Sequence, residues 1–355
     1  MNKKIRQIII ISVISFLFFS GCVETEKIND GAGQSDSSIR SPEGMKRYLE
    51  GRHLPALQSV QVWNSSYGEG LELTTANYQI FTTLLDPLML SQIPAFMESA
   101  CRAYNSQLPS PIETKNRFVI YLFADRRQWE DFTTAFAGSD APVYLKIKAG
   151  AYCLKGDCVA YNIGREATFS ILGHEAWHQF NSRHFRFRLP SWLDEGIAML
   201  FETNRYERGF FYFQADKNLY RLGGLKKTLA NHKIIPLRQL LMINPGQVLS
   251  VDNSEAVTAF YSQSYALVRF LREDSYGKRL LSYQKMLLDG LNGSWPLDPA
   301  IKNISANRNI PLTVQWNQIV GPQLFRQYID SDIEKAEKEY YAFCQKITYH
   351  VHFKE

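Results

Sequence analysis

The chain has 355 residues, of which 45% are apolar, and its formal net charge is +5. This composition excludes an intrinsically disordered protein and can supply the core of one large or two modest domains. Three of the positive charges lie in the first six residues, so the rest of the chain is nearly balanced and does not indicate a nucleic-acid partner.

Residues 1–21 predict a secretory signal. Three cations precede an apolar run over residues 8–19 that is short for a membrane span, and Gly21-Cys22 follows it. This ending resembles the lipobox of bacterial lipoproteins, although Phe19 stands where leucine is usual. The resemblance implies a lipid on Cys22 and a protein anchored to a membrane of the bacterial cell envelope, outside the cytoplasm. An ordinary cleaved signal and an uncleaved anchor are the alternatives.

Residues 22–60 are predicted to form a flexible tether. The segment after Cys22 is polar and contains Asp-Gly-Ala-Gly and Ser-Asp-Ser-Ser. It has no basic patch, so the lipid alone would hold the protein at the membrane.

Residues 61–165 alternate between strand-like and helix-like patterns, which predicts a small α/β part with a mixed sheet. Dense β-branched and aromatic runs indicate the strands, and apolar residues at helical spacing indicate the helices. The expected strands cover 78–82 and 117–123, the expected helices cover 88–104 and 126–136, and a hairpin is expected from 147–152 with 158–163.

Four cysteines follow Cys22, and export would permit disulfides among them. Cys153 and Cys158 flank Leu-Lys-Gly-Asp in the expected hairpin, so a bridge across it is one hypothesis, with Cys101 and Cys344 as the other pair. The spacing establishes neither bond, and free buried thiols are the alternative.

After Gly164 the pattern becomes mainly helical, and the predicted fold class is therefore α+β. Residues 166–292 would form the helical part of the main body, followed by a C-terminal helical extension over residues 293–355. Within the first of these parts, helices are expected over 166–180, 191–202, 255–273 and 277–291.

The segment His174-Glu175-Ala176-Trp177-His178 has the HExxH pattern of zinc hydrolases. Residues four apart share one helix face, so both imidazoles can reach the same metal ion. Glu175 lies beside them, where it can take a proton from water that zinc has made more acidic. A surface helix with two exposed histidines is the alternative interpretation.

A zinc hydrolase needs a third protein ligand, and Glu195 is the preferred candidate. It lies in Trp-Leu-Asp-Glu-Gly-Ile-Ala, where Ser191 and Asp194 form a capping pattern. That pattern places Glu195 in the first turn of a second helix, which the intervening chain is long enough to bring beside the first.

The competing candidate for the third ligand is His184. It lies ten residues after His174, the spacing of HExxHxxGxxH sites, with Asn181 in place of the glycine. Against it, the arginine-rich tract over residues 183–188 indicates a solvated loop.

The motifs HEAWHQF and LPSWLDEGIAMLFE resemble the gluzincin metallopeptidases, and most closely the peptidase-MA-like domains of bacterial exported proteins. The resemblance covers roughly residues 70–290, strongly at the two motifs and weakly elsewhere. It implies that the helical part is a zincin-like catalytic part, that His174, His178 and Glu195 bind Zn²⁺, and that Glu175 is the general base.

Gluzincins also stabilise the tetrahedral oxyanion with a tyrosine or histidine near the zinc. The segment 260–268 resembles a helix that often follows the ligand helix in these domains, which makes Tyr261 the candidate. Tyr265, one turn along the same face, is held in reserve, and two core aromatics are the alternative. Glu202 is expected either to support a ligand or to be an exposed charge.

These patterns predict a membrane-anchored zinc metallopeptidase that acts on a peptide or protein substrate. The second hypothesis is a non-catalytic lipoprotein of the same fold that serves as an envelope binding module, with the aromatic tract 210–213 as a partner surface. Hydrolysis of a non-protein amide or ester by the same site is a third hypothesis.

Overall fold

The structure is a computed structural model, and it describes residues 37–148, 150–249, 253–310 and 312–351. The predicted signal, the predicted lipidation site Cys22 and the first part of the predicted tether lie outside the described residues.

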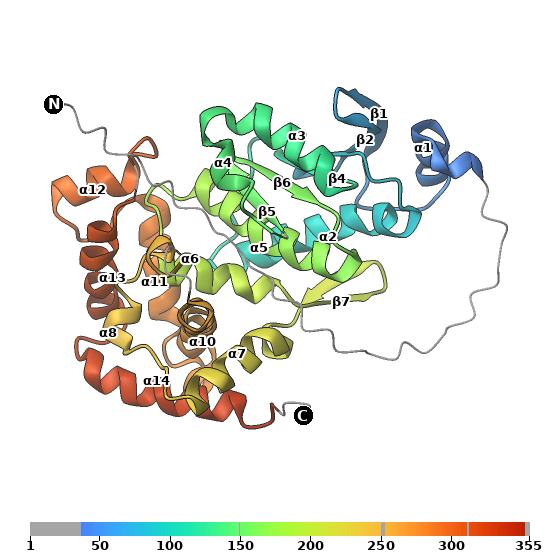
Figure 1. The fold of residues 1–355 in the computed structure, drawn as a ribbon. Coiled ribbons are helices and arrows are strands. Elements are labelled where there is room, and N and C mark those ends of the chain that lie inside the picture. The colour runs from blue at the N-terminus through green and yellow to red at the C-terminus, as the bar shows by residue number, and fades with distance from the viewer. Residues whose placement is uncertain (1–36, 149, 250–252, 311, 352–355) are drawn as a thin grey trace.

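A six-stranded mixed sheet forms the N-terminal half, as predicted (Figure 1). The strand order is β1-β2-β3-β4-β6-β5, where β3, β4 and β6 run parallel and the other neighbours are antiparallel. The strands are Ser59–Ser65 (β1), Gly68–Thr74 (β2), Tyr78–Thr82 (β3), Phe118–Phe123 (β4), Ala151–Leu154 (β5) and Asp157–Tyr161 (β6).

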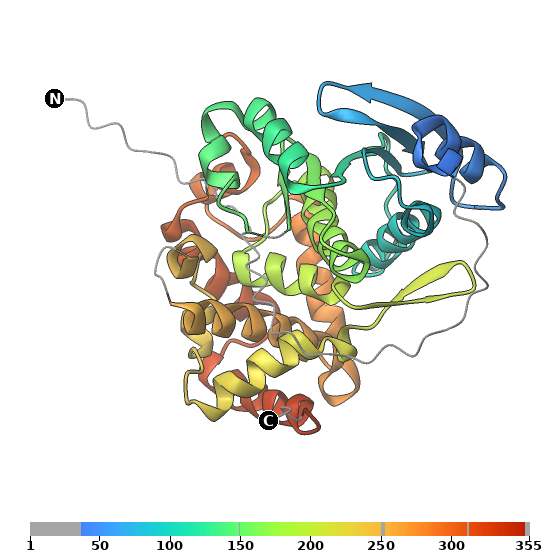
Figure 2. The same cartoon turned by 45° about the vertical axis from the view of Figure 1, so that its right-hand side comes forward.

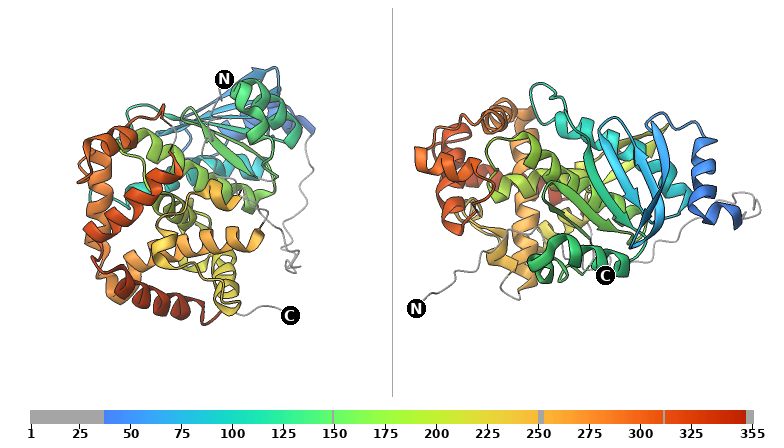
Figure 3. Two further views of the ribbon diagram at one scale, coloured as in Figure 1. Left: turned by 60° about the vertical axis from the view of Figure 1, so that its left-hand side comes forward. Right: turned by 90° about the horizontal axis from the view of Figure 1, so that it is seen from above.

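Helices cover both faces of this sheet, which is why its central strands are rich in large apolar residues. On one face, Leu71, Ile80 and Ile120 belong to the core that α2 and α5 complete. On the other face, α3 and α4 enclose a smaller core around Trp129 and Phe123 (Figure 3). These helices are Pro87–Asn105 (α2), Arg126–Ala137 (α3), Ala141–Tyr144 (α4) and Arg165–His184 (α5).

The C-terminal half is mainly helical, which confirms the predicted α+β class. The buried helix α10 lies among α6, α7, α11 and α14 (Figures 1 and 2). The helices are Ser191–Ala198 (α6), Leu219–Ala230 (α7), Leu237–Leu240 (α8), Pro245–Leu249 (α9), Ser254–Gly277 (α10), Leu280–Asn292 (α11), Pro299–Ala306 (α12), Val314–Tyr328 (α13) and Ile333–Thr348 (α14). A second hairpin joins Asn204–Glu207 (β7) to Phe210–Phe213 (β8).

The predicted tether over residues 22–60 is wrong in its second half. Helix α1, Pro42–Glu50, begins with Ser41, whose hydroxyl accepts a hydrogen bond from the Gly44 amide at 3.1 Å. Met45 and Leu49 are buried in the main core, and β1 begins at Ser59. The apolar residues of this segment therefore hold it against the folded body.

The predicted C-terminal extension is helical, and it contributes to the same core as the rest of the chain. Trp316, Phe325 and Tyr340 are buried together with residues of α5 and α6. Among the residues described, none of the helices combines the length and apolar character needed to cross a bilayer.

Candidate metal centre

The HExxH segment lies in the middle of α5, the helix between the sheet and the helical half. The His174 side chain is fully buried and that of His178 is 13% exposed, so the alternative of two exposed histidines is wrong. Gly173 allows this depth, because a Cβ atom there would lie 2.3 Å from the carbonyl oxygen of Phe201.

Helix α6 holds Glu195 opposite the two histidines, as predicted, but the predicted cap is wrong. The Ser191 amide and hydroxyl both donate to Oδ1 of Asn317, at 3.0 and 3.1 Å, and no side chain of α6 caps its own helix. The carboxylate of Asp194 instead faces α5. Asn317, on α13, therefore replaces the local cap with a long-range one.

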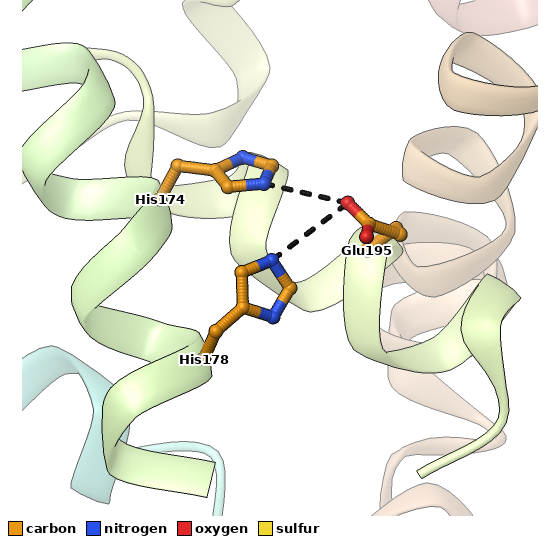
Figure 4. A group of neighbouring side chains, drawn as sticks. All are labelled: His174, His178 and Glu195. Atoms are coloured by element: carbon orange, nitrogen blue, oxygen red, sulfur yellow. Dashed lines mark ion pairs between the residues drawn. The ribbon is translucent and has the colours of Figure 1, made fainter. Parts of the chain in front are cut away.

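The three predicted ligands converge (Figure 4). Nε2 of His174 lies 3.4 Å and Nε2 of His178 lies 3.8 Å from the same oxygen, Oε2 of Glu195. One ligand atom from each residue lies within 4.8 Å of the other two. Two imidazole nitrogens and one carboxylate oxygen are a donor set of catalytic zinc sites, which leave one position for water or substrate.

Each histidine is oriented by a second carboxylate on the far side of its ring. Nδ1 of His174 donates to Glu202 at 3.0 Å, and Nδ1 of His178 lies 3.2 Å from Asp194. Asp194 also accepts hydrogen bonds from Trp177 and Asn181, each at 2.9 Å. These contacts direct both Nε2 atoms toward Glu195, as in metal sites whose ligands are held by an outer layer of carboxylates.

Glu202 is itself held by a buried cation, Arg221 of α7. The guanidinium donates to both carboxylate oxygens, at 2.6 and 2.8 Å, and the Asn218 amide donates at 2.8 Å. Burial alone would raise the pKa of Glu202, but Arg221 and the His174 hydrogen bond lower it to about 2. Glu202 is therefore ionised at neutral pH, and its carboxylate accepts the hydrogen bond from Nδ1 of His174.

Glu175 is buried beside the ligands, and burial raises the pKa of its carboxyl to about 7, although both histidines oppose the shift. Burial would lower the pKa of His178, but Asp194 and Glu195 outweigh it and raise that pKa to about 10. The surrounding carboxylates therefore favour a cation between the imidazoles, whether a proton or a metal ion.

Three buried polar atoms supply the test of whether a metal fits. Nε2 of His174, Nε2 of His178 and Oε1 of Glu175 have no hydrogen-bond partner among the described residues. A buried polar atom without a partner costs roughly 1–3 kcal/mol, so three at one point favour an external partner. A zinc ion with a bound water would satisfy them.

His184 takes no part in this group. Its Nε2 lies 3.3 Å from the Thr114 hydroxyl, and its ring packs on Phe118 and Phe180. The tract that follows it also differs from the predicted solvated loop, since Phe185 and Phe187 are buried. The structure therefore favours Glu195 over His184 as the third ligand.

Tyr261 is connected to the candidate centre by its contact with Arg221. The guanidinium carbon lies 5.5 Å from the centre of its ring, and the same guanidinium holds Glu202. The Tyr265 hydroxyl already has two hydrogen-bond partners away from the site, because it donates to the Ala215 carbonyl and accepts from Arg269 at 3.0 Å. Tyr261 remains the candidate for the oxyanion role.

The disulfide that was one hypothesis for the β5–β6 hairpin is not formed, and the alternative of free thiols is confirmed for the described cysteines. Cys153 and Cys158 face each other in register, but they and the other described cysteines, Cys101 and Cys344, are free thiols. The Cys153 thiol donates instead to the carbonyl oxygen of Glu175 at 2.9 Å. The hairpin thereby contacts α5, the helix that carries the HExxH segment, directly.

Sequence analysis missed Asp194, Arg221 and Asn317 as supports of the site. Asp194 directly precedes Glu195, and that adjacency is a usable signal, because the two carboxylates can reach the two ends of one imidazole. Arg221 and Asn317 carry no such signal. They lie 19 and 126 residues from their partners, and only the fold brings them in.

A comparison with protein-family models gave no match, and searches of the curated proteins and of the solved structures gave no significant match either.

Proposed function

We propose that the chain is a zinc-dependent metallopeptidase of the gluzincin type. The observation that carries this proposal is the convergence of His174, His178 and Glu195 on one buried point, with Glu175 beside them. In this assignment the two histidines and Glu195 hold the metal, and Glu175 is the general base.

The residues divide the work of hydrolysis among them. A bound zinc ion would supply a Lewis acid that polarises the scissile carbonyl and makes water more acidic. Glu175 takes the proton from the attacking water and returns it to the leaving amine. Glu202 and Asp194 hold the imidazoles in one orientation throughout, and Tyr261 is the candidate donor to the developing oxyanion.

The proposed enzyme is anchored at the cell envelope through a lipid on Cys22. Support for this part comes from the signal-like first 21 residues and the Gly-Cys that closes them. If Cys22→Ser is expressed in a bacterial host, the protein should leave the membrane fraction while the unaltered chain stays in it. Equal retention of both in the membrane would contradict the lipid anchor.

An envelope binding module is the second candidate, favoured by the exposed aromatic side chains of the β7–β8 hairpin. Tyr206, Phe210 and Tyr212 are each about half exposed. A module that had lost activity would not need to keep a general base, yet Glu175 is present and buried beside a full ligand set. The catalytic proposal is therefore preferred.

Glu175→Gln tests the proposal most directly. Amide and carboxylate have the same shape, so the variant should retain one zinc per chain by elemental analysis and lose at least about a hundredfold in turnover of a peptide library. Glu166→Gln, an exposed change on the same helix, is the matched control and should keep full turnover. Full activity in Glu175→Gln would disprove the mechanism, and zinc binding without any turnover in the unaltered protein would favour the binding module.

A further inference from the structure

We propose that a pocket outside the candidate metal centre binds an organic carboxylate with an aromatic or large apolar substituent. This second site lies between α2, the end of α10 and the β7–β8 hairpin. The inference does not depend on the proposed peptidase activity. None of His174, His178 and Glu195 lines this pocket.

The pocket has the size and walls of a small-molecule site. Its volume is about 390 Å³, which lies in the range of ligand pockets. Phe201, Phe211 and Phe213 supply an apolar wall, and Phe96 packs behind Phe211 and Phe213. A side chain of aromatic size therefore has a rigid surface to lie on.

The charge of the pocket is one-sided. Arg102 from α2 and Arg272 from α10 both line it, and none of the described residues in its lining is an aspartate or a glutamate. Among the described residues, neither guanidinium forms an ion pair with a carboxylate, in contrast to Arg221, Arg269 and Arg279 nearby in the chain. Two cations that share one pocket without a counter-charge favour an anion there.

One of these cations is already held in place. Nη2 of Arg102 donates to the Ser99 hydroxyl at 2.9 Å, and its guanidinium carbon lies 5.6 Å from the centre of the Phe210 ring. The Ser99 hydroxyl in turn accepts a hydrogen bond from the Phe211 amide at 3.2 Å. The hairpin and the arginine are thus fixed to each other, which reduces the entropy lost when a ligand binds.

The geometry points to a carboxylate because of how a guanidinium recognises anions. Its planar fork of N–H groups matches a planar carboxylate with two parallel hydrogen bonds. The other polar residues of the lining, Ser99, Ser106 and Gln107, are neutral, so the two arginines are the charged groups that a carboxylate would meet among the described residues of the pocket. An N-acylated aromatic amino acid with a free carboxylate combines both requirements.

The test is calorimetric titration of the intact protein with N-acetylphenylalanine, its amide and acetate. Since hydrogen bonds to a charged carboxylate are stronger than those to a neutral amide, the acid should bind at least about tenfold more tightly than the amide. Acetate, which contacts none of the apolar wall, should also bind at least about tenfold more weakly. Equal binding of acid and amide overturns the anion site, and equal binding of acid and acetate overturns the assigned substituent.

Two further titrations show where on the protein the acid binds. Titration in the presence of a chelator should give the same affinity, and loss of binding there would assign the acid to the metal centre and overturn the second site. Arg102→Gln combined with Arg272→Gln should abolish binding, while Arg205→Gln, an exposed arginine of β7 outside the pocket, should not change it. Undiminished binding in the double variant would also overturn the proposal.

Discussion

Each histidine of the candidate centre lies between two carboxylates, and that arrangement explains how these polar side chains can be buried together. Glu195 faces Nε2 of both rings, while Glu202 and Asp194 each face one Nδ1. Buried carboxylates are costly unless they meet cations or donors. Arg221 and the imidazoles meet that requirement within the chain, and a divalent cation would complete it.

Asp194→Asn tests the orienting role of the outer carboxylates. The change keeps the size of the side chain but removes the charge that His178 Nδ1 faces, so zinc affinity should fall by roughly 10–100-fold. Competition with a chromophoric chelator measures this. As a control, Asp298→Asn at the start of α12 should leave the affinity unchanged. Equal zinc affinity in both variants would show that Asp194 does not contribute to zinc binding.

Glu202 makes stability depend on pH in the acid range. Because its pKa is lowered to about 2 in the folded chain, its contribution is complete above the unfolded value of 4.5 and is lost as pH falls toward 2. A shift of this size contributes at most about 3 kcal/mol. In urea unfolding of the metal-free protein, Glu202→Gln should be less stable at pH 7 and should lose less stability than the unaltered chain between pH 4.5 and 3. Parallel losses would contradict the low pKa.

At the scale of elements, two glycines set how closely the ligand-bearing helices approach their neighbours. Gly173 lets α5 meet the backbone that follows α6. Gly196, next to Glu195, lets α6 meet α10, because a Cβ atom there would lie 2.5 Å from both the Ser264 carbonyl oxygen and a methyl group of Val268. Close packing of these helices is what brings Glu195 within reach of α5.

Gly196→Ala should therefore destabilise the protein despite the better helix propensity of alanine. Overpacking of this kind costs about 1–3 kcal/mol, and it should move Glu195 enough to weaken zinc binding. Gly223→Ala in α7 is the matched control, since a Cβ atom there meets nothing within 4 Å. The control should gain up to about 1 kcal/mol. If thermal unfolding shows both variants stabilised, the close contact between α6 and α10 is disproved.

At the scale of the whole molecule, the C-terminal helices brace the segment that joins the two motif helices. Arg188 donates to the Ile304 and Ile310 carbonyls, and Arg308 donates to the Phe185 carbonyl at 2.8 Å. Asn317 caps α6. Residues more than 100 positions away in the chain thus help to determine where α6, the helix that carries Glu195, begins.

Asn317→Ala tests this long-range support. It removes the side chain that accepts hydrogen bonds from both the hydroxyl and the amide of the buried Ser191, at a cost of roughly 1–3 kcal/mol. The exposed Asn303→Ala in α12 should stay within about 0.5 kcal/mol of the unaltered chain. Chemical denaturation compares the two, and equal stability would show that α6 needs no cap from α13.

Local patterns were sufficient for much of the fold and for the two histidines of the candidate centre. The strand predicted over 78–82 matches β3, and the helix predicted over 88–104 lies within α2. The HExxH spacing implied one shared helix face, which α5 has. By contrast, β1, β2 and the β7–β8 hairpin were missed, because their exposed or half-buried residues give weak alternation and their partners are decided by the sheet.

The amino-acid order alone determined that His174, Glu175 and His178 lie together on one helix and that Glu195 follows on a second, because spacing along a helix and a short return loop are local properties. The tertiary structure decided which of Glu195 and His184 completes the group, and it supplied Arg221 and Asn317. Those choices rest on contacts between distant segments, whose free energy depends on how the whole core packs and leaves no periodic trace in the chain.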